Sequence, residues 1–248
     1  MAANTYRETV RERVLYNLVF FAILMTLSGL LLGQLSIRQD EKIVKDIGLA
    51  SMDAFGSLIA IFIGVGLVSK EIERRSLYPL LAKPLGRGEF LLGKFAGLGF
   101  TLLVNIGLMA VGLFLTLLVT HRSADLRLLI AIYGIYLGLV LTVAIALFFS
   151  ALASSSLLAS VWTVCLVMAG RYSEVIRNMR QVTEVPPWLA QALYLALPNF
   201  RNFDVKDRVV YGQAVAGDEL VTITLYALIY SGVLLGAASL AFRSRDLT

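Results

Sequence analysis

The sequence predicts an all-α, polytopic membrane protein with six transmembrane helices. Of its 248 residues, 58% are hydrophobic and only 16% are charged, and its mean hydropathy is +0.79. A soluble domain normally carries about a quarter charged residues. Several uncharged stretches are also long enough to cross a bilayer, which takes about 20 helical residues. Helices embedded in lipid are therefore expected to make up most of the chain.

The charge-free stretches define the expected elements. A single helix across 128–170 would be about twice as long as the hydrocarbon layer is thick, so the serines of "SALASSSLLAS" at 150–160 predict a turn. The segment "PPWLAQALYLAL" is too short to span and predicts short interfacial helices before the last span. We expect one transmembrane domain over 1–248, with an amphipathic entry helix at 1–13 and spans at about 14–36, 48–69, 95–120, 128–151, 155–171 and 220–242.

Six spans place both termini on the same side of the membrane. Lys and Arg are equally numerous on the two sides, so their count does not decide the orientation. The dense basic cluster in the loop at 70–94 favours a cytoplasmic position for this loop and for both termini. We therefore expect the loop at 172–219 to be extracytoplasmic and the protein to lie in the cell inner membrane.

Composition argues against several kinds of chemistry. One cysteine, Cys165, cannot form an internal disulfide, and one histidine, His121, leaves almost no histidine-based metal chemistry. The net charge of +5 is more typical of Lys and Arg near anionic lipid headgroups than of a nucleic-acid partner. We expect no catalytic, cofactor-binding or metal-binding residue in this chain.

One stretch, "GRGEFLLGKF" at 86–95, has most of a phosphate-binding loop, with Gly88, Gly93 and Lys94 in place. Phe95, however, stands where that motif needs a hydroxyl group for magnesium. The stretch also follows a proline turn and leads into a predicted span, whereas a phosphate loop joins a buried strand to a soluble helix. We therefore exclude a nucleotide site and expect Lys94 at the membrane interface.

Two polar segments outside the spans indicate contacts with other molecules. The loop at 70–94 contains Pro79 and Pro84, which end a short polar helix and suit a rigid knob that docks on another protein. A basic loop that only sets topology is the alternative. The segment "NTYRETVRERVLYN" is typical of an amphipathic helix on the membrane surface, with a solvated tail as the alternative.

Lone polar residues in the spans are candidates for a transport pathway, because they are costly in lipid. Asp53 lies close enough to the outer boundary to reach water, whereas Asn105 is deeper and is expected to form an interhelical hydrogen bond. Gln34 is the third such residue. Glycines four residues apart let helix backbones approach, and we expect one or two of four such pairs to do so: Gly29/Gly33, Gly93/Gly97, Gly134/Gly138 and Gly232/Gly236.

In this arrangement the chain resembles the membrane subunits of ATP-binding-cassette (ABC) exporters of the type-2 permease class. It is most similar to the six-span permeases typified by the one in nitrous-oxide-reductase maturation. Three stretches carry the resemblance, and their order and spacing extend it over nearly the whole chain: "TYRETVRERVLY", "SKEIERRSLYPLLAKPLGRGEFLLGKFAG" and "LYLALPNFRNFDV".

The resemblance implies a homodimer in which two permease copies form the pathway, with contacts through the first and fifth spans. Two copies of a separate nucleotide-binding ATPase subunit, which holds ATP and magnesium, would sit on the cytoplasmic face. Membrane lipid and an extracytoplasmic protein are further expected partners. The implied ATPase-coupling residues are Glu71, Glu73, Arg74, Arg75, Pro84, Arg87 and Glu89, with Arg7, Glu8 and Arg11 on the entry helix.

Two other function classes remain open from the residues. A membrane scaffold or assembly protein would hold partners and move nothing. A secondary transporter working alone would need several buried ionisable residues along a pathway, and the predicted spans offer only Asp53. The residues do not choose a substrate.

Overall fold

The computed structural model describes residues 40–73, 87–121, 125–153, 155–173 and 197–244, together with positions 20 and 191. Every element in these ranges is helical, and no strand occurs among them. The expected all-α class is therefore confirmed for the described part of the chain. Its elements are α3 (Asp40–Glu73), α5 (Arg87–His121), α6 (Leu128–Leu152), α7 (Ser156–Arg171), the short 3-10 helix η2 (Phe200–Phe203), α10 (Lys206–Val210) and α11 (Gly217–Ser244).

Four of these helices are long and apolar enough to cross a membrane. Helix α7 is also apolar but has only 16 residues, fewer than the roughly 20 that a full span needs. The five helices coincide with the second to sixth expected spans. The first expected span at 14–36, the entry helix at 1–13 and most of the expected interfacial helices lie outside the described residues. The four long apolar segments are Glu41–Gly66, Gly88–Val119, Leu128–Leu152 and Gly217–Ala241.

Helices α3 and α5 are longer than the spans predicted for them from the sequence. Helix α3 extends from Asp40 to Glu73, where we expected 48–69, and α5 begins at Arg87, where we expected 95. The apolar window marks only the part of a helix in lipid, because the backbone stays helical until a cap or a proline ends it. Charged residues at the start of α3 support the extension, since Lys45 pairs with Glu41 one turn earlier at 2.8 Å.

The turn expected in "SALASSSLLAS" joins α6 to α7. Ala153 follows α6 in an extended conformation, and Ser155 has the extended φ and ψ of an N-cap residue. The Ser155 hydroxyl accepts a hydrogen bond from the Leu158 backbone N–H at 3.3 Å and so caps α7. This serine therefore reverses the chain and starts the next helix.

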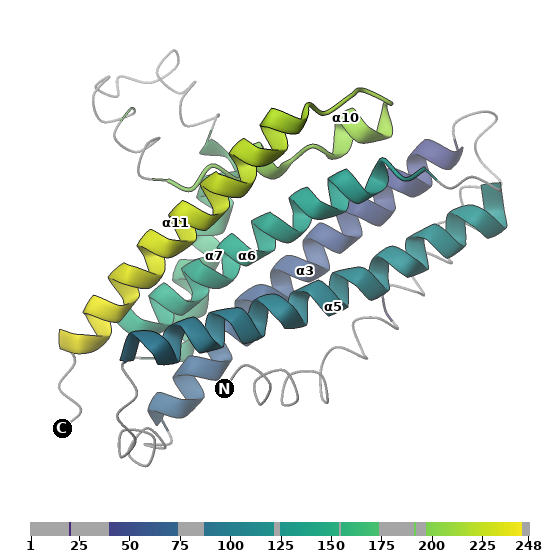
Figure 1. Ribbon diagram of the computed structural model, residues 1–248. Helices are drawn as coiled ribbons and strands as arrows, with labels where there is room; N and C mark the ends of the chain where they lie inside the picture. Colours follow the sequence, from purple (N-terminus) through teal and green to yellow (C-terminus); the bar gives the residue numbers. More distant parts are fainter. Residues whose placement is uncertain are drawn as a thin grey trace, which may run out of the picture.

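Helix α6 is the centre of the bundle and packs against α3, α5, α7 and α11 (Figure 1). Eighteen of its 25 residues are buried. Helix α11 instead exposes large apolar side chains such as Ile229, Val233 and Leu240. A bundle that is apolar both at its centre and on its outer faces is suited to a lipid environment.

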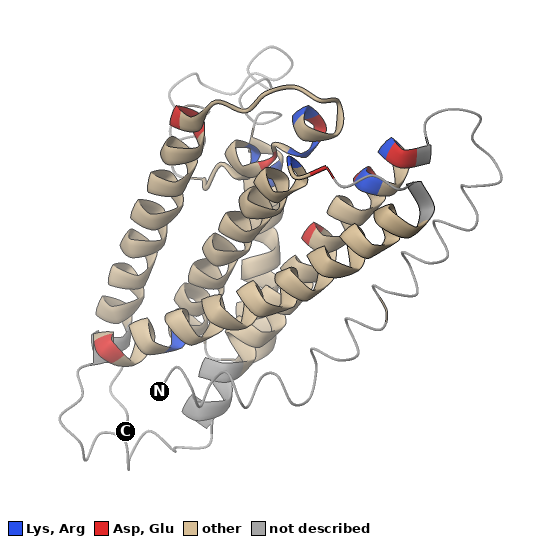
Figure 2. Cartoon of the chain, turned by 45° about the vertical axis from the view of Figure 1, so that its right-hand side comes forward, with Lys and Arg blue, Asp and Glu red and all other residues tan. Residues whose placement is uncertain are grey.

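The helices run between two ends of the bundle (Figure 1). We call them the α10 end, where α3, α6 and α11 begin and α7 ends, and the Glu73 end, where α3 ends and α5 begins. Most charged residues of the described helices lie near these ends, and long uncharged stretches separate them (Figure 2). The polar chemistry of the described part is therefore concentrated at its ends.

Backbone around residues 198–205 packs directly onto α6 and α7. A Cβ added to Gly134 would lie 2.6 Å from the Phe203 carbonyl oxygen, and one added to Gly170 would clash with the Pro198 carbonyl oxygen. Only glycine leaves room for such approaches. The Gly134/Gly138 pair thus does allow close packing, but against Phe203 at the end of the short 3-10 helix η2 and not against another membrane-spanning helix. The Gly232/Gly236 pair has nothing within 4 Å of either added Cβ.

We predict that Gly134→Ala destabilises the protein more than Gly138→Ala does. A Cβ at Gly134 meets rigid backbone, whereas one at Gly138 would lie at an ordinary 3.7 Å from the Phe203 Cβ and 3.8 Å from its ring. Overpacking of this kind costs about 1–3 kcal/mol, which corresponds to a loss of roughly 3–10 °C in melting temperature. Thermal unfolding of the detergent-purified variants measures the difference, and equal melting temperatures would contradict it.

Candidate functional site

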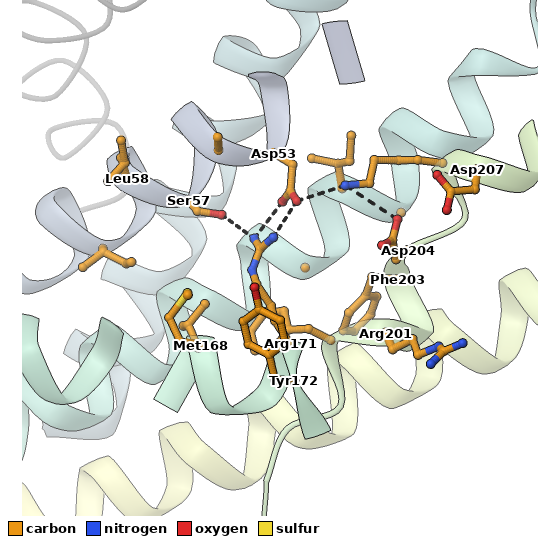
Figure 3. A pocket seen from close by; sticks show the side chains of 18 of the residues that line it. Asp53, Ser57, Leu58, Met168, Arg171, Tyr172, Arg201, Phe203, Asp204 and Asp207 are labelled. Carbon is orange, nitrogen blue, oxygen red and sulfur yellow. Dashed lines mark hydrogen bonds and ion pairs between the residues drawn. The ribbon is translucent and has the colours of Figure 1, made fainter. Parts of the chain in front are cut away.

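A cavity of about 1070 Å³ opens at the α10 end, between α3, α6, α7 and the segment from η2 to α10 (Figure 3). One part of the cavity wall is apolar and the other part is charged. Apolar side chains such as Leu58, Ile61 and Val167 line one part, and charged groups line the other. The charged groups are Asp53, Arg171, Arg201, Asp204, Lys206, Asp207 and Arg208.

The centre of the charged part is an ion pair between Asp53 on α3 and Arg171 at the end of α7. Arg171 Nη1 donates to Asp53 Oδ2 at 2.6 Å, and Nη2 donates to Oδ1 at 2.9 Å. Nη2 also donates to the hydroxyl of Ser57, one turn after Asp53, at 2.8 Å. An ion pair in which a guanidinium group bonds a carboxylate through two nitrogens is strong and requires a specific geometry.

Lys206, the first residue of α10, joins the same carboxylate. Its Nζ donates to Asp53 Oδ2 at 3.3 Å and lies 3.6 Å from Asp204 Oδ1. The side chains of Asp53, Lys206 and Arg171 are 16%, 17% and 32% exposed. One partly buried carboxylate thus connects α3, α7 and α10.

Local structure around η2 places its residues against these charges. The Asn199 side-chain oxygen caps η2 by accepting from the Arg201 backbone N–H at 3.1 Å, and the Asn199 backbone N–H donates to the Tyr226 hydroxyl on α11 at 2.8 Å. The Phe200 ring then lies under the Arg171 guanidinium, 5.9 Å from centroid to Cζ, a cation–π distance. The aromatic residues of "PNFRNFDV" therefore help to orient Arg171.

Further ion pairs tie other connections at the same end. Lys45 on α3 bonds Asp125, just before α6, at 3.1 Å. Burial tends to raise the pKa of the Asp125 carboxyl, but its hydrogen bonds with Lys45 and with the Arg127 backbone lower it, and the net pKa lies below the ordinary 3.8. The pair therefore stabilises the fold at neutral pH and loses its contribution only as acid takes the pH through that lowered pKa. Arg208 on α10 pairs with Glu219 on α11.

The arrangement suits charge pairing more than covalent chemistry. The Asp53 carboxylate already accepts hydrogen bonds from two cations, Arg171 and Lys206. Among the described residues, no group of three or more His, Cys, Asp or Glu side chains could hold a metal ion. The cavity is therefore a place where charges hold elements together beside an apolar wall.

Asn105, the other residue expected to be a pathway candidate, lies elsewhere. It is fully buried on α5 and does not line the cavity. Neither its Oδ1 nor its Nδ2 has a hydrogen-bond partner within the described ranges, so the expected interhelical hydrogen bond is not formed there. Gln34 lies outside the described residues.

Four of the expected coupling residues lie within the described ranges, on the two helix ends that meet at the Glu73 end (Figure 1). Glu71 and Glu73 belong to the last turn of α3, whereas Arg87 and Glu89 belong to the first turn of α5. Glu89 is exposed. The other expected coupling and entry-helix residues lie outside the described ranges: Arg7, Glu8, Arg11, Arg74, Arg75 and Pro84.

The stretch that looked like a phosphate loop is helical from Arg87 onward, as part of α5. Lys94 is only 4% exposed, and its Nζ lies 5.2 Å from the centroid of the Phe90 ring. A helical backbone has its amides bonded within the helix and cannot wrap them around a phosphate. The stretch therefore forms a helix from Arg87 onward and not a loop, and Lys94 is more buried than an interfacial lysine was expected to be.

Sequence reasoning missed Arg171 and Lys206 as partners of Asp53. A signal for Arg171 was present, because Asp53 lies near the start of the second span and Arg171 ends the fifth. With six alternating spans these two positions face the same side of the membrane, so opposite charges there could pair. Lys206 lies in a long connection whose path the pattern of apolar residues does not specify.

We predict that Asp53→Asn lowers stability far more than Glu219→Gln. The first change leaves the partly buried Arg171 without its anion and Lys206 with Asp204 alone, which costs about 2–5 kcal/mol. The second breaks a pair whose side chains are 38% and 35% exposed, and exposed pairs contribute about 0–1 kcal/mol. Melting temperatures of the two variants in the same detergent test this, and a greater loss for Glu219→Gln would contradict it.

Comparison with known proteins agrees with this architecture. The sequence profile of the family described as "ABC-2 family transporter protein" matches residues 2–172, well over half of the chain. The matched range includes α3, α5, α6 and α7 and ends just after Arg171. A search of curated proteins found no match. The apolar helices and the extent of the profile match show that the chain belongs to the ABC-2 transporter family, whose members are membrane components of ABC transporters.

Proposed function

We propose that the chain is the permease subunit of an ABC-type exporter, forms the translocation pathway as a homodimer, and is driven by a separate ATPase subunit. Family membership supports a permease, and permeases of this family normally pair with an ATPase. The observation that carries the proposal further is the path of α3. This single helix runs from the cavity at the α10 end to Glu71 and Glu73 at the Glu73 end.

A continuous helix can carry motion between these two ends. From Asp53 to Glu73, α3 extends for about 30 Å at 1.5 Å per residue. A push on its last turn tilts or shifts the helix as a rigid body, because every backbone hydrogen bond inside it resists local bending. A partner that moves the Glu73 end therefore also moves Asp53 and the cavity wall.

The remaining details of the proposal concern segments that lie wholly or partly outside the described ranges. The segment at 70–94 is the cytoplasmic knob that docks on the ATPase, with the entry helix at 1–13 beside it and a first span at 14–36. The loop at 172–219 is extracytoplasmic and available to an extracytoplasmic protein, and both termini are cytoplasmic in the cell inner membrane. ATP and magnesium bind the partner, and the similarity to permeases of nitrous-oxide-reductase maturation belongs to this proposal as well.

Purification of the tagged chain from its native membranes in mild detergent, followed by an ATPase assay, tests the proposal. An exporter yields a nucleotide-binding subunit in equal amounts, identified by mass spectrometry, and ATP hydrolysis in the purified complex. An intact permease without such a subunit would favour a scaffold or a transporter working alone.

We predict that Glu71→Ala combined with Arg75→Ala uncouples the ATPase and leaves the permease folded in the membrane. Each charge-assisted hydrogen bond lost at the knob removes about 1.5–3 kcal/mol, so ATPase binding falls about tenfold or more. The matched control, Arg208→Ala with Glu219→Ala, removes one acid and one arginine at the opposite end and should keep ATPase binding. Equal ATPase recovery with both double variants would contradict the assignment of the knob.

A further inference from the structure

We propose that Asp53, Arg171 and Lys206 form a releasable latch, which holds α3 and α7 together beside the cavity and opens when α3 is displaced from the Glu73 end. Driving by an ATPase rests on the function proposed above. The latch itself rests on the contacts of the described residues. We call these three residues the Asp53 latch.

The latch is built so that one group controls three elements. Both terminal nitrogens of Arg171 bond Asp53, at 2.6 and 2.9 Å, and Lys206 bonds the same carboxylate at 3.3 Å. Figure 3 shows Asp53 and Ser57 on α3 bonded directly to Arg171. Separating α3 from α7 by a few ångströms breaks the two Arg171–Asp53 bonds together, because bidentate geometry tolerates little displacement.

Pairing among the charges argues for a latch and against a ligand site. Arg171 directs both terminal nitrogens at Asp53 and Ser57, and Lys206 lies between Asp53 and Asp204. An anionic ligand entering here would have to displace the Asp53 carboxylate first. In the closed form the charged groups of the latch therefore pair with one another, as they should in a contact between moving elements.

Helix α7 is held to the bundle by few buried side chains. Only four of its 16 residues are buried, and all are small or medium in size: Ala159, Thr163, Val167 and Gly170. The neighbouring α6 has 18 buried residues among 25. Apolar burial thus holds α6 firmly to α3 and α5 but holds α7 lightly, so the ion pair supplies a large share of the contact between α7 and α3.

Partial exposure makes the latch reversible. The Arg171 side chain is 32% exposed and that of Asp53 is 16% exposed. Water can therefore replace the broken bonds as the helices part, which lowers the cost of opening below that of a fully buried pair. The free energies of the open and closed forms can then differ by an amount that one cycle of the ATPase can supply.

Cysteine accessibility tests the latch in the permease–ATPase complex reconstituted into vesicles. The reporter is Val167→Cys, a cavity-lining residue that is 3% exposed, in a background where the exposed Cys165 is replaced by serine. A membrane-impermeant maleimide is added to each side in separate samples. We expect slow labelling without ATP, faster labelling during ATP turnover, and labelling about tenfold faster without ATP in Asp53→Asn, because bonds of the closed form are lost.

Three companion variants complete the test. Lys206→Gln removes one of the three bonds to Asp53 and should give an intermediate labelling rate. Arg171→Lys keeps the charge, loses the bidentate geometry, and replaces Asp53→Asn if that variant does not fold. Glu219→Gln breaks the Arg208 pair at the same end without touching Asp53, and it should label like the background.

Each outcome separates the latch from the function on which it rests. If the folded Asp53→Asn and Arg171→Lys variants are labelled no faster than the background protein, the latch is overturned. This holds even if ATP still raises the labelling rate of the background protein. Fast labelling in those variants, with no effect of ATP on the background, would support the latch and contradict driving by an ATPase. Equally fast labelling in Glu219→Gln would show general loosening of the α10 end and would also overturn the latch.

Discussion

A carboxylate on a membrane-spanning helix needs a cation, and this constraint organises the α10 end. Asp53 lies on the apolar helix α3, and Arg171 satisfies it through two bonds. That requirement fixes the end of α7 against α3. Lys206 then brings α10 to the same point, and Gly134 and Gly170 leave room for the intervening backbone. Removing the carboxylate would leave two cations together, so the contacts among α3, α7 and α10 depend on it.

The bundle combines one firmly packed part with one lightly packed helix. Helices α3, α5 and α6 share a continuous apolar core that includes Leu49, Met109 and Leu139. Helix α7 contributes little to burial and is positioned by a capped turn at Ser155 and by Arg171 at its other end. Dispersion and apolar burial act over a whole surface and yield gradually, whereas an ion pair breaks over a short displacement. Because of this difference in how the contacts break, we expect α3 and α7 to move relative to one another.

Features that follow from local chemistry could be predicted from the sequence. Uncharged length located five of the expected helices, the serines located the turn, and the cost of a charge in lipid singled out Asp53. Charges at the start of α3 misled the prediction of its extent, since Lys45 and Glu41 stay helical by pairing. Arg171 and Lys206 depend on how distant segments meet, as does the burial of Asn105 without a partner in the described ranges. Those contacts arise from tertiary packing, which apolar periodicity alone does not encode.

The exposure of the Asp53–Arg171 pair determines what kind of contact it can be. A pair as buried as the apolar core would cost too much to open, because two bare charges would be left away from water. A pair as exposed as Arg208–Glu219 would hold the helices too weakly, since water and salt compete for it. With Asp53 at 16% exposure and Arg171 at 32%, the pair lies between these limits. Because the same helix α3 carries Asp53 and, 20 residues later, Glu73 at its end, displacement of this one helix is enough to strain the pair from the far side of the bundle.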